Sequence, residues 1–228
     1  MLQSIINLFF PKACAGCNAI LLIAESVICT ECRHNIPLTN HHRITDNEVL
    51  LKFYGKLEIV HASALFYFQK KGVVQELIHK LKYKGHQEIG KTIGFWYADE
   101  LKNSSALLDV DYIIPVPLHQ KKFKKRGYNQ VNTFGKALSE RLQIPIKDLI
   151  LVRDKNTKSQ TRKNRLHRSE SVSHVFSVAA TTDFHYKHFL LIDDVITTGA
   201  TLESCGRELL KIPGARLSIV CMAMTKDQ

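Results

Sequence analysis

The chain has 228 residues, of which 45% are apolar and 23% charged, and its formal net charge is +11. This ordinary globular composition suits one domain, or one domain with a small appendage, and excludes collagen, a coiled coil and wholesale disorder. The longest apolar runs, at 19–24 and 189–192, are far shorter than the ~20 residues that a membrane helix needs. The N-terminus lacks the basic start and cleavage site of a signal peptide. We therefore expect a soluble, cytoplasmic protein without a membrane span.

The positive charge is concentrated in one block. Residues 119–168 hold 15 Lys/Arg and 3 Asp/Glu, whereas the other 178 residues hold 17 and 18. Such a block attracts an anion, which could be a nucleic-acid backbone, a polyphosphate metabolite or an anionic membrane surface. Two basic stretches, 121–126 and 153–168, flank one predicted helix. This arrangement favours an anion site over a solvated basic face.

Four of the six cysteines form two CxxC pairs near the N-terminus, Cys14/Cys17 and Cys29/Cys32. Two such knuckles can direct four thiolates at one tetrahedral Zn²⁺, and a closed set of four ligands indicates a structural metal. Disulfides would need an oxidising compartment, and a thioredoxin-like site needs one CxxC rather than two. The eleven-residue gap is shorter than in the commonest zinc pattern.

The cysteine pairs define a four-cysteine zinc-ribbon module over residues 1–38, which is too small to fold without its metal. The polar residues 39–50 are interpreted as a linker, in which His41 and His42 are expected to be exposed. Residues 51–228 form the main domain. The remaining cysteines, Cys205 and Cys221, are expected to be small buried hydrophobic residues.

Strand and helix patterns alternate along the main domain. Strands are predicted at 60–68, 111–116, 149–152, 174–178, 188–192 and 216–224, and helices at 73–82, 88–101, 128–142 and 201–211. This order predicts an α/β fold, a mostly parallel sheet flanked by helices. Ligands of such sheets bind outside the carboxyl ends of the strands.

The segment 190–201, LLIDDVITTGAT, joins an apolar strand to a helix. Its hydroxyls, small residues and helix N-terminus suit a phosphate, while Asp193 and Asp194 would repel one but can accept hydrogen bonds from a sugar diol. The segment therefore points to a ribose phosphate. The alternative, a plain strand–helix junction with a Thr cap, explains only part of it. The chain contains no GxxxxGK[ST], GxGxxG, GxSxG or HExxH motif.

The same segment resembles the phosphoribosyl pyrophosphate (PRPP) motif of type I phosphoribosyltransferases. The whole chain resembles the competence protein F (ComF) family, which joins an N-terminal zinc module to such a domain. The resemblance also rests on the two cysteine pairs, on PVPLH at 115–119 followed by KRGYNQ at 125–130, and on SQT at 159–161 with Arg168 and Phe176. Ser171 departs from the asparagine usual in the family.

The resemblance implies a role for each motif. Asp193 and Asp194 would hold the ribose hydroxyls, and they are the candidate catalytic residues together with Arg126. The loop 118–126 would face the pyrophosphate, with Mg²⁺ carried on PRPP. Residues 153–168 would form a lid. The implied PRPP contacts are Leu118, His119, Arg126, Asp193, Asp194, Val195, Thr197, Thr198, Gly199, Ala200 and Thr201, with Arg153, Gln160 and Arg168 in the lid.

Two functions follow from these motifs and from the charge. The favoured one, which the resemblance implies, is a PRPP-binding phosphoribosyltransferase-like protein of the ComF type that acts in natural competence or DNA uptake. It would transfer phosphoribose from PRPP to an unknown acceptor, a reaction of nucleoside metabolism. The other is a non-catalytic accessory protein that binds single-stranded DNA during natural competence, with competence proteins as partners. The basic block suits both, because PRPP and DNA are both anions. Its few aromatic residues only weakly indicate base stacking.

Overall fold

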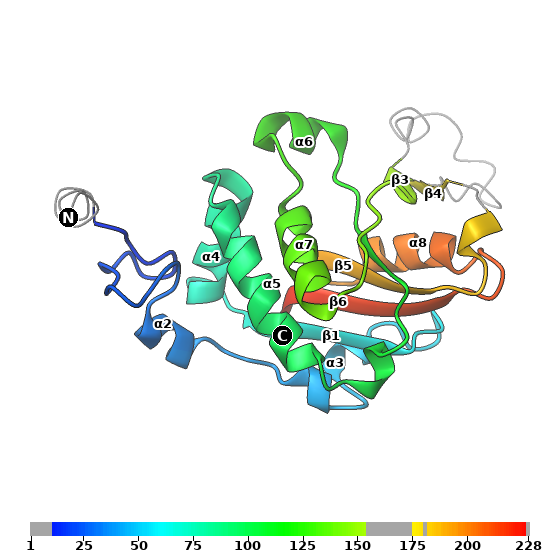
Figure 1. Ribbon diagram of the computed structural model, residues 1–228, viewed down its shortest axis with the longest axis horizontal. Coiled ribbons are helices and arrows are strands. Elements are labelled where there is room, and N and C mark those ends of the chain that lie inside the picture. The colour runs from blue at the N-terminus through cyan, green and yellow to red at the C-terminus, as the bar shows by residue number, and fades with distance from the viewer. Residues whose placement is uncertain (1–10, 154–174, 180–181, 227–228) are drawn as a thin grey trace, which may run out of the picture.

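The computed structural model describes residues 11–153, 175–179 and 182–226. Its centre is a four-stranded parallel sheet in the order β1-β6-β5-β2 (Figure 1). These strands are β1 (His61–Phe68), β2 (Tyr112–Pro115), β5 (His188–Ile196) and β6 (Arg216–Thr225). A separate antiparallel pair is formed by β3 (Leu151–Arg153) and β4 (Phe176–Val178). The α/β fold with a mostly parallel sheet is thus confirmed.

Helices cover both faces of the sheet because its strands are apolar on both sides. Along β5, Leu190 and Ile192 pack into one apolar cluster, while Phe189 and Leu191 pack into the other. The first cluster includes α4 (Val73–Tyr83), α5 (Gln87–Leu101) and α7 (Gln130–Leu142), and the second includes α8 (Ala200–Leu209). The sheet thereby forms the middle layer of the domain.

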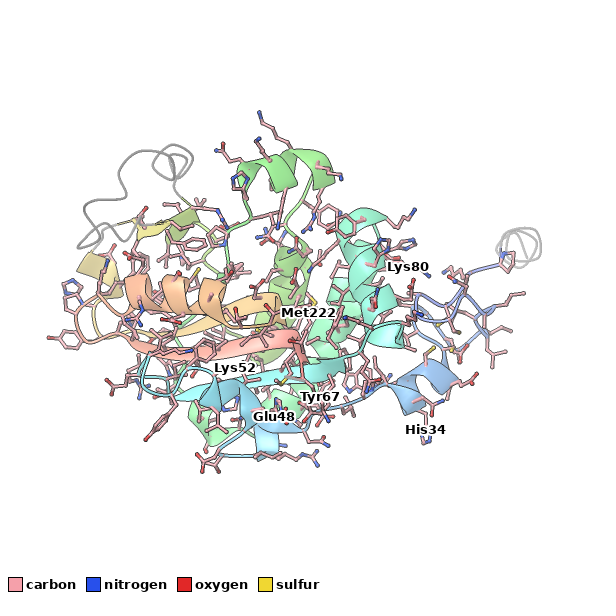
Figure 2. All side chains as sticks on the ribbon, turned by 180° about the vertical axis from the view of Figure 1, so that it is seen from behind. His34, Glu48, Lys52, Tyr67, Lys80 and Met222 are labelled. Atoms are coloured by element: carbon pink, nitrogen blue, oxygen red, sulfur yellow. The ribbon has the colours of Figure 1, made fainter. Side chains whose placement is uncertain are left out.

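The N-terminal module packs beside α4 (Figures 1 and 2). Its short helix α2 (Thr30–Asn35) follows the second cysteine knuckle. The Lys80 ammonium of α4 donates to Asn18 Oδ1 at 2.6 Å, and the Arg33 guanidinium lies 4.8 Å from the centre of the Trp96 ring. The module is therefore attached to the helical layer by polar and cation–π contacts.

Residues that follow the module pair with the edge of the sheet. Thr39 N–H donates to the Leu65 carbonyl of β1 at 3.0 Å, and a short helix η1 (His41–Arg43) follows. Asn47 caps α3 (Glu48–Leu51) and also donates to the Ala62 carbonyl at 2.8 Å. This segment is polar in sequence, yet its side chains satisfy the backbone of β1.

The expectation that His41 and His42 are exposed is wrong. His41 is 1% exposed and packs edge-on against Tyr67, and the side chain of His42 is 6% exposed beside Glu100. Because this segment pairs with β1, the His41 ring lies against Tyr67 of β1 and the His42 ring lies near Tyr97 of α5. Burial lowers the pKa of both imidazoles below the ordinary value, so both are favoured in the neutral form.

Two elements near the ends of the strands differ from the sequence prediction. β5 continues through Asp193 and Asp194 to Ile196, beyond the apolar run. Residues expected to form a loop instead contain a seven-residue helix, α6 (Gln120–Arg126), which is capped by His119 and ends at Gly127 with φ 78°. α6 buries no side chain, so it lacks the apolar periodicity by which helices are recognised. The described chain also contains η2 (Ser105–Leu107) and η3 (Thr182–Phe184).

Helices α5 and α7 approach closely through two glycines. A Cβ at Gly94 would lie 2.6 Å from Ala137 Cβ and 2.7 Å from the Phe134 carbonyl oxygen, and one at Gly90 would lie 2.2 Å from Thr133 Oγ1. These glycines let the helices pack over the buried half of the sheet. Among the described residues, no helix is both long and apolar enough to cross a membrane.

We expect Gly94→Ala to destabilise the protein, because the new methyl group meets the backbone of α7. The overpacking cost of about 1–3 kcal/mol exceeds the gain in helix propensity of about 1 kcal/mol. Thermal unfolding should show a lower midpoint. Lys91→Ala, on the exposed side of the same helix, is the matched control and should change it little. A higher midpoint for Gly94→Ala would contradict the packing argument.

Candidate functional site

The four N-terminal cysteines form one cluster, as their spacing predicted. Their sulfur atoms all lie within 4.8 Å of one another, and Cys17 Sγ and Cys29 Sγ are 3.7 Å apart. Sulfurs bound tetrahedrally to one Zn²⁺ at about 2.3 Å lie about 3.8 Å from each other. Three of the four cysteines are buried and Cys17 is exposed. The geometry therefore suits a structural zinc ion.

Backbone amides prepare Cys14 for the thiolate form. Its sulfur accepts the N–H of Gly16 at 3.3 Å and that of Cys29 at 3.2 Å. Burial raises the pKa of Cys14, but the N–H groups outweigh burial and lower the pKa to about 6. Gly16 is needed for space, because a Cβ there would lie 3.0 Å from Cys32 Sγ and 2.8 Å from Val73.

We expect one zinc ion per chain, bound by Cys14, Cys17, Cys29 and Cys32. Cys29→Ser should release it and destabilise the N-terminal module, since metal binding and folding are coupled in a module of this size. Metal analysis by mass spectrometry and thermal unfolding measure both effects. Cys205→Ala removes a cysteine outside the cluster and should keep the zinc. Purified wild-type protein without zinc, or with disulfides at these positions, would refute the expectation.

A cavity of about 290 Å³ opens where β2 and β5 end. It lies at the carboxyl edge of the parallel sheet, where ligands of such folds bind. Its walls come from α4, the β2–α6 loop, α6, α7, β3, β5 and α8. The lining residues are Lys82, Val116, Pro117, Leu118, His119, Lys122, Arg126, Gln130, Arg153, Asp193, Asp194, Val195 and Thr201.

A smaller cavity of about 50 Å³ lies between the end of β5 and the start of α8. Thr197, Thr198, Gly199 and Ala200 line it, and Asp193, Val195 and Thr201 line both cavities. Gly199 has φ 81°, and a Cβ there would lie 3.2 Å from the Phe53 ring. The loop is therefore tight, and the N-terminal amides of α8 are available for an anion.

A polar network joins the acidic pair to α4 and α7. Lys82 Nζ lies 2.8 Å from Asp194 Oδ1, and Gln130 Nε2 donates to Asp194 Oδ2. Arg126 donates to Gln130 Oε1 at 2.5 Å and to the Tyr83 hydroxyl at 3.3 Å. Asp194 is thus oriented by groups from two helices, and one of these groups, Gln130, also binds Arg126.

Five lining residues are absent from the contacts named from the sequence, although one of them, Lys122, belongs to the loop expected to face the pyrophosphate. The five are Lys82, Val116, Pro117, Lys122 and Gln130. Gln130 is the last residue of the KRGYNQ motif, so attention to that motif could have found it. Lys122 is one of several basic residues in a run, and only the turn of α6 distinguishes it. Lys82 is at the end of a separate helix, and nothing in its neighbours along the chain signals a contact with Asp194.

Arg153 of β3 also faces the cavity, whereas its predicted partners in the lid, Gln160 and Arg168, lie outside the described residues. Its guanidinium is 5.1 Å from the centre of the Phe176 ring. The buried Nε atom of Arg153 has no hydrogen-bond partner among the described residues. A buried N–H without a partner costs free energy, so an anion in the cavity would stabilise it.

Asp193 carries an unusual pKa. Burial raises the pKa, the adjacent charge of Asp194 raises it further, and the Asp194 N–H, Lys82 and Lys122 lower it, leaving a value of about 7. The two side chains cannot both be ionised near neutral pH without a cost. A ligand that donates hydrogen bonds to the pair would relieve that cost.

We expect Asp193→Asn to stabilise the protein increasingly between about pH 4 and pH 7, and by a constant amount above pH 7. Between the ordinary pKa of 3.8 and the folded-state pKa of about 7, Asp193 is ionised in the unfolded chain but protonated in the folded protein, so the stability of wild type falls as the pH rises. Asparagine carries no charge and avoids this cost. Thermal midpoints of wild type and variant across this range measure the effect, and Asp148→Asn, at an exposed position, is the control. A midpoint difference independent of pH would contradict the raised pKa.

A Ser–His–Asp series of contacts also occurs, at the opposite end of β5. His188 Nδ1 lies 2.9 Å from Asp109 Oδ1, and His188 Nε2 lies 2.8 Å from Ser218 Oγ. Both His188 and Ser218 are buried inside the sheet, at 1% and 0% exposure. A nucleophile must reach its substrate, so this series satisfies buried polar groups and is not a hydrolase triad.

Comparisons with known proteins agree with the fold and the motifs. Residues 132–228 match a family model described as phosphoribosyl transferase domain. This C-terminal part of the chain is therefore similar to phosphoribosyltransferase domains. It is 28% identical over 215 residues to Competence protein F of Haemophilus influenzae, covering 90% of this chain and 93% of that protein.

Two further relatives are similar over shorter or more distant alignments. Competence protein ComFC of Bacillus subtilis is 25% identical over 205 residues, which cover 88% of this chain and 78% of that protein. DNA utilization protein YhgH of Shigella flexneri is 27% identical over 152 residues, which cover 65% of this chain and 66% of that protein. These homologues confirm the resemblance drawn from the sequence.

Proposed function

We propose that this chain is a competence-related, phosphoribosyltransferase-like protein that binds PRPP or a related ribose phosphate in the cavity at the end of β5. The proposal rests on three features that line two adjoining cavities: two carboxylates, a loop of small residues at a helix N-terminus, and several cations. A ribose diol, a 5-phosphate and a pyrophosphate need these three environments, respectively.

The acidic pair suits the diol. A carboxylate offers about four lone-pair sites, so Asp194 retains acceptor capacity after binding Lys82 and Gln130. Asp193 Oδ1 accepts the Asp194 N–H at 2.8 Å, which orients its carboxylate. The loop 197–201 and the first turn of α8 then suit the 5-phosphate, because their N–H groups and hydroxyls donate to anions.

The cations suit the pyrophosphate. Lys122, Arg126 and Arg153 line the cavity and come from two elements, α6 and β3, so they can surround a leaving group. Transfer would break the bond between ribose C1 and the pyrophosphate oxygen and form one to an acceptor, and fixed cations stabilise the charge that develops on the leaving group. Mg²⁺, bound to the substrate phosphates and water, would neutralise further charge.

The names of the relatives support a role in DNA handling. Competence protein F and Competence protein ComFC align with 90% and 88% of this chain, and DNA utilization protein YhgH aligns with 65% of it. The exposed lysines of α6, Lys121, Lys124 and Lys125, are available for a nucleic-acid backbone. Lys122, which belongs to the same basic run, instead lines the ribose phosphate cavity with Arg126. Binding of single-stranded DNA is the second candidate function.

Isothermal titration with PRPP·Mg²⁺ tests the proposal. Asp193→Asn combined with Asp194→Asn should weaken PRPP by roughly 10- to 100-fold, as expected when a charged hydrogen-bond acceptor is lost. Inorganic phosphate should lose no affinity, because the pair contacts hydroxyls and its negative charge repels phosphate. Asp148→Asn is the control. Equal losses for both ligands would show that the carboxylates act through the fold, and wild-type protein that binds neither ligand would refute the proposal.

A further inference from the structure

A second cavity, of about 400 Å³, lies between the end of α4 and α6. Its lining residues are His79, Lys82, Tyr83, Lys84, Gly85, Lys125, Arg126 and Tyr128. Lys82 and Arg126 line both this cavity and the ribose phosphate cavity. The two spaces are therefore neighbours that share two cations.

The charge of this second cavity is entirely positive. No acidic side chain lines it, in contrast to the carboxylate pair of the ribose phosphate cavity. Within the described part of the chain, Lys84 and Lys125 form no ion pair with a carboxylate, and both are exposed. The cavity consequently favours an anion, and it has no carboxylate that could accept hydrogen bonds from a sugar diol.

Aromatic rings form the rest of the wall. Tyr83 is 54% exposed, and the Arg126 guanidinium lies 4.9 Å from the centre of its ring. The His79 ring is 5.2 Å from Tyr83 at an angle of 48°. The Tyr128 hydroxyl donates to the Leu81 carbonyl, which holds that ring in the wall. Flat aromatic and guanidinium groups of this kind are surfaces on which nucleobases stack.

We propose that this second cavity binds a nucleotide unit, with its base stacked on the Tyr83–Arg126 layer and its phosphate on Lys84 and Lys125. Base and phosphate are the shared chemistry of a free nucleotide and of one position in a single strand. The basic block at 119–168 contains few aromatic residues, but α4 brings Tyr83 and His79 to it from outside. This proposal does not rest on the binding of ribose phosphate in the first cavity.

The shared cations make the two cavities interdependent. Pyrophosphate bound beside Arg126 would compete with a nucleotide for the same guanidinium and add a like charge nearby. Ribose 5-phosphate has no pyrophosphate and would leave Arg126 available. We therefore expect PRPP·Mg²⁺ to weaken nucleotide binding and ribose 5-phosphate to leave it unchanged.

The test uses 2′,3′-dideoxyadenosine 5′-monophosphate, which lacks the diol that the acidic pair would contact, and a ten-nucleotide strand of thymidines. Isothermal titration of the full chain gives the affinities. Tyr83→Ala should weaken the dideoxynucleotide by roughly 5- to 100-fold, from the loss of base stacking. Tyr83→Phe keeps the ring and should change the affinity by less than about threefold. Tyr54→Ala and Lys56→Ala, far along the chain and exposed, are the controls.

The phosphate is tested separately. Lys84→Ala with Lys125→Ala should weaken both probes, and it should flatten the salt dependence of strand binding by about one to two units of log K per log salt, as expected for two lost phosphate contacts. If only the dideoxynucleotide binds in a Tyr83-dependent way, the ligand of the site is a free nucleotide. If only the strand does so, the ligand is a nucleic acid.

Three results would overturn the site. The first is that the dideoxynucleotide binds no tighter than inorganic phosphate and that Tyr83→Ala also leaves binding of the strand unchanged. The second is that Tyr83→Phe and Tyr83→Ala lose equal affinity. The third is that ribose 5-phosphate displaces the nucleotide. Failure of PRPP to bind while the nucleotide still binds would refute the proposed function and leave this site standing.

Discussion

Two adjacent carboxylates at the end of β5 determine much of what surrounds them. Asp193 and Asp194 lie at the edge of a buried sheet, where a pair of negative charges is unfavourable. The chain compensates with Lys82 from α4, Gln130 from α7 and Lys122 from α6. The helices α4, α6 and α7, all distant in sequence from β5, are thus held around the end of that strand. These groups and the acidic pair together line the cavity at the end of β5.

The main elements could be predicted because their buried residues form a recognisable pattern of apolar residues along the sequence. Leu77 and Leu81 repeat along α4, and Leu190–Ile192 form an apolar run in β5, so the pattern of apolar residues indicates a helix and a strand. The cysteine cluster could also be predicted, because the spacing of two CxxC pairs is typical of four sulfurs around one zinc ion. The C-terminal ends of the strands then indicated where a site would lie, and the cavity does open there.

Other features depend on contacts that the local sequence does not contain. α6 is capped by His119 and ended by Gly127, and it buries nothing, so no apolar pattern marks it. Thr39 and Asn47 are polar, yet they lie buried against β1, where their side chains donate hydrogen bonds to the carbonyls of Ala64 and Ala62. Lys82 reaches Asp194 across 112 positions of the chain. Such pairings follow from packing, which periodicity and motifs do not specify.

If each cavity binds its proposed ligand, one basic region distinguishes two anions. Charge alone would attract PRPP and a nucleotide equally, because both carry phosphates. Asp193 and Asp194 on one side add acceptors for a diol and repel any further negative charge, whereas Tyr83 on the other side adds a stacking surface and no acid. Arg126 lies between them, bound to both Gln130 and Tyr83. Selectivity would then come from the neutral and acidic neighbours of the cations, and the shared arginine would let the state of one cavity influence the other.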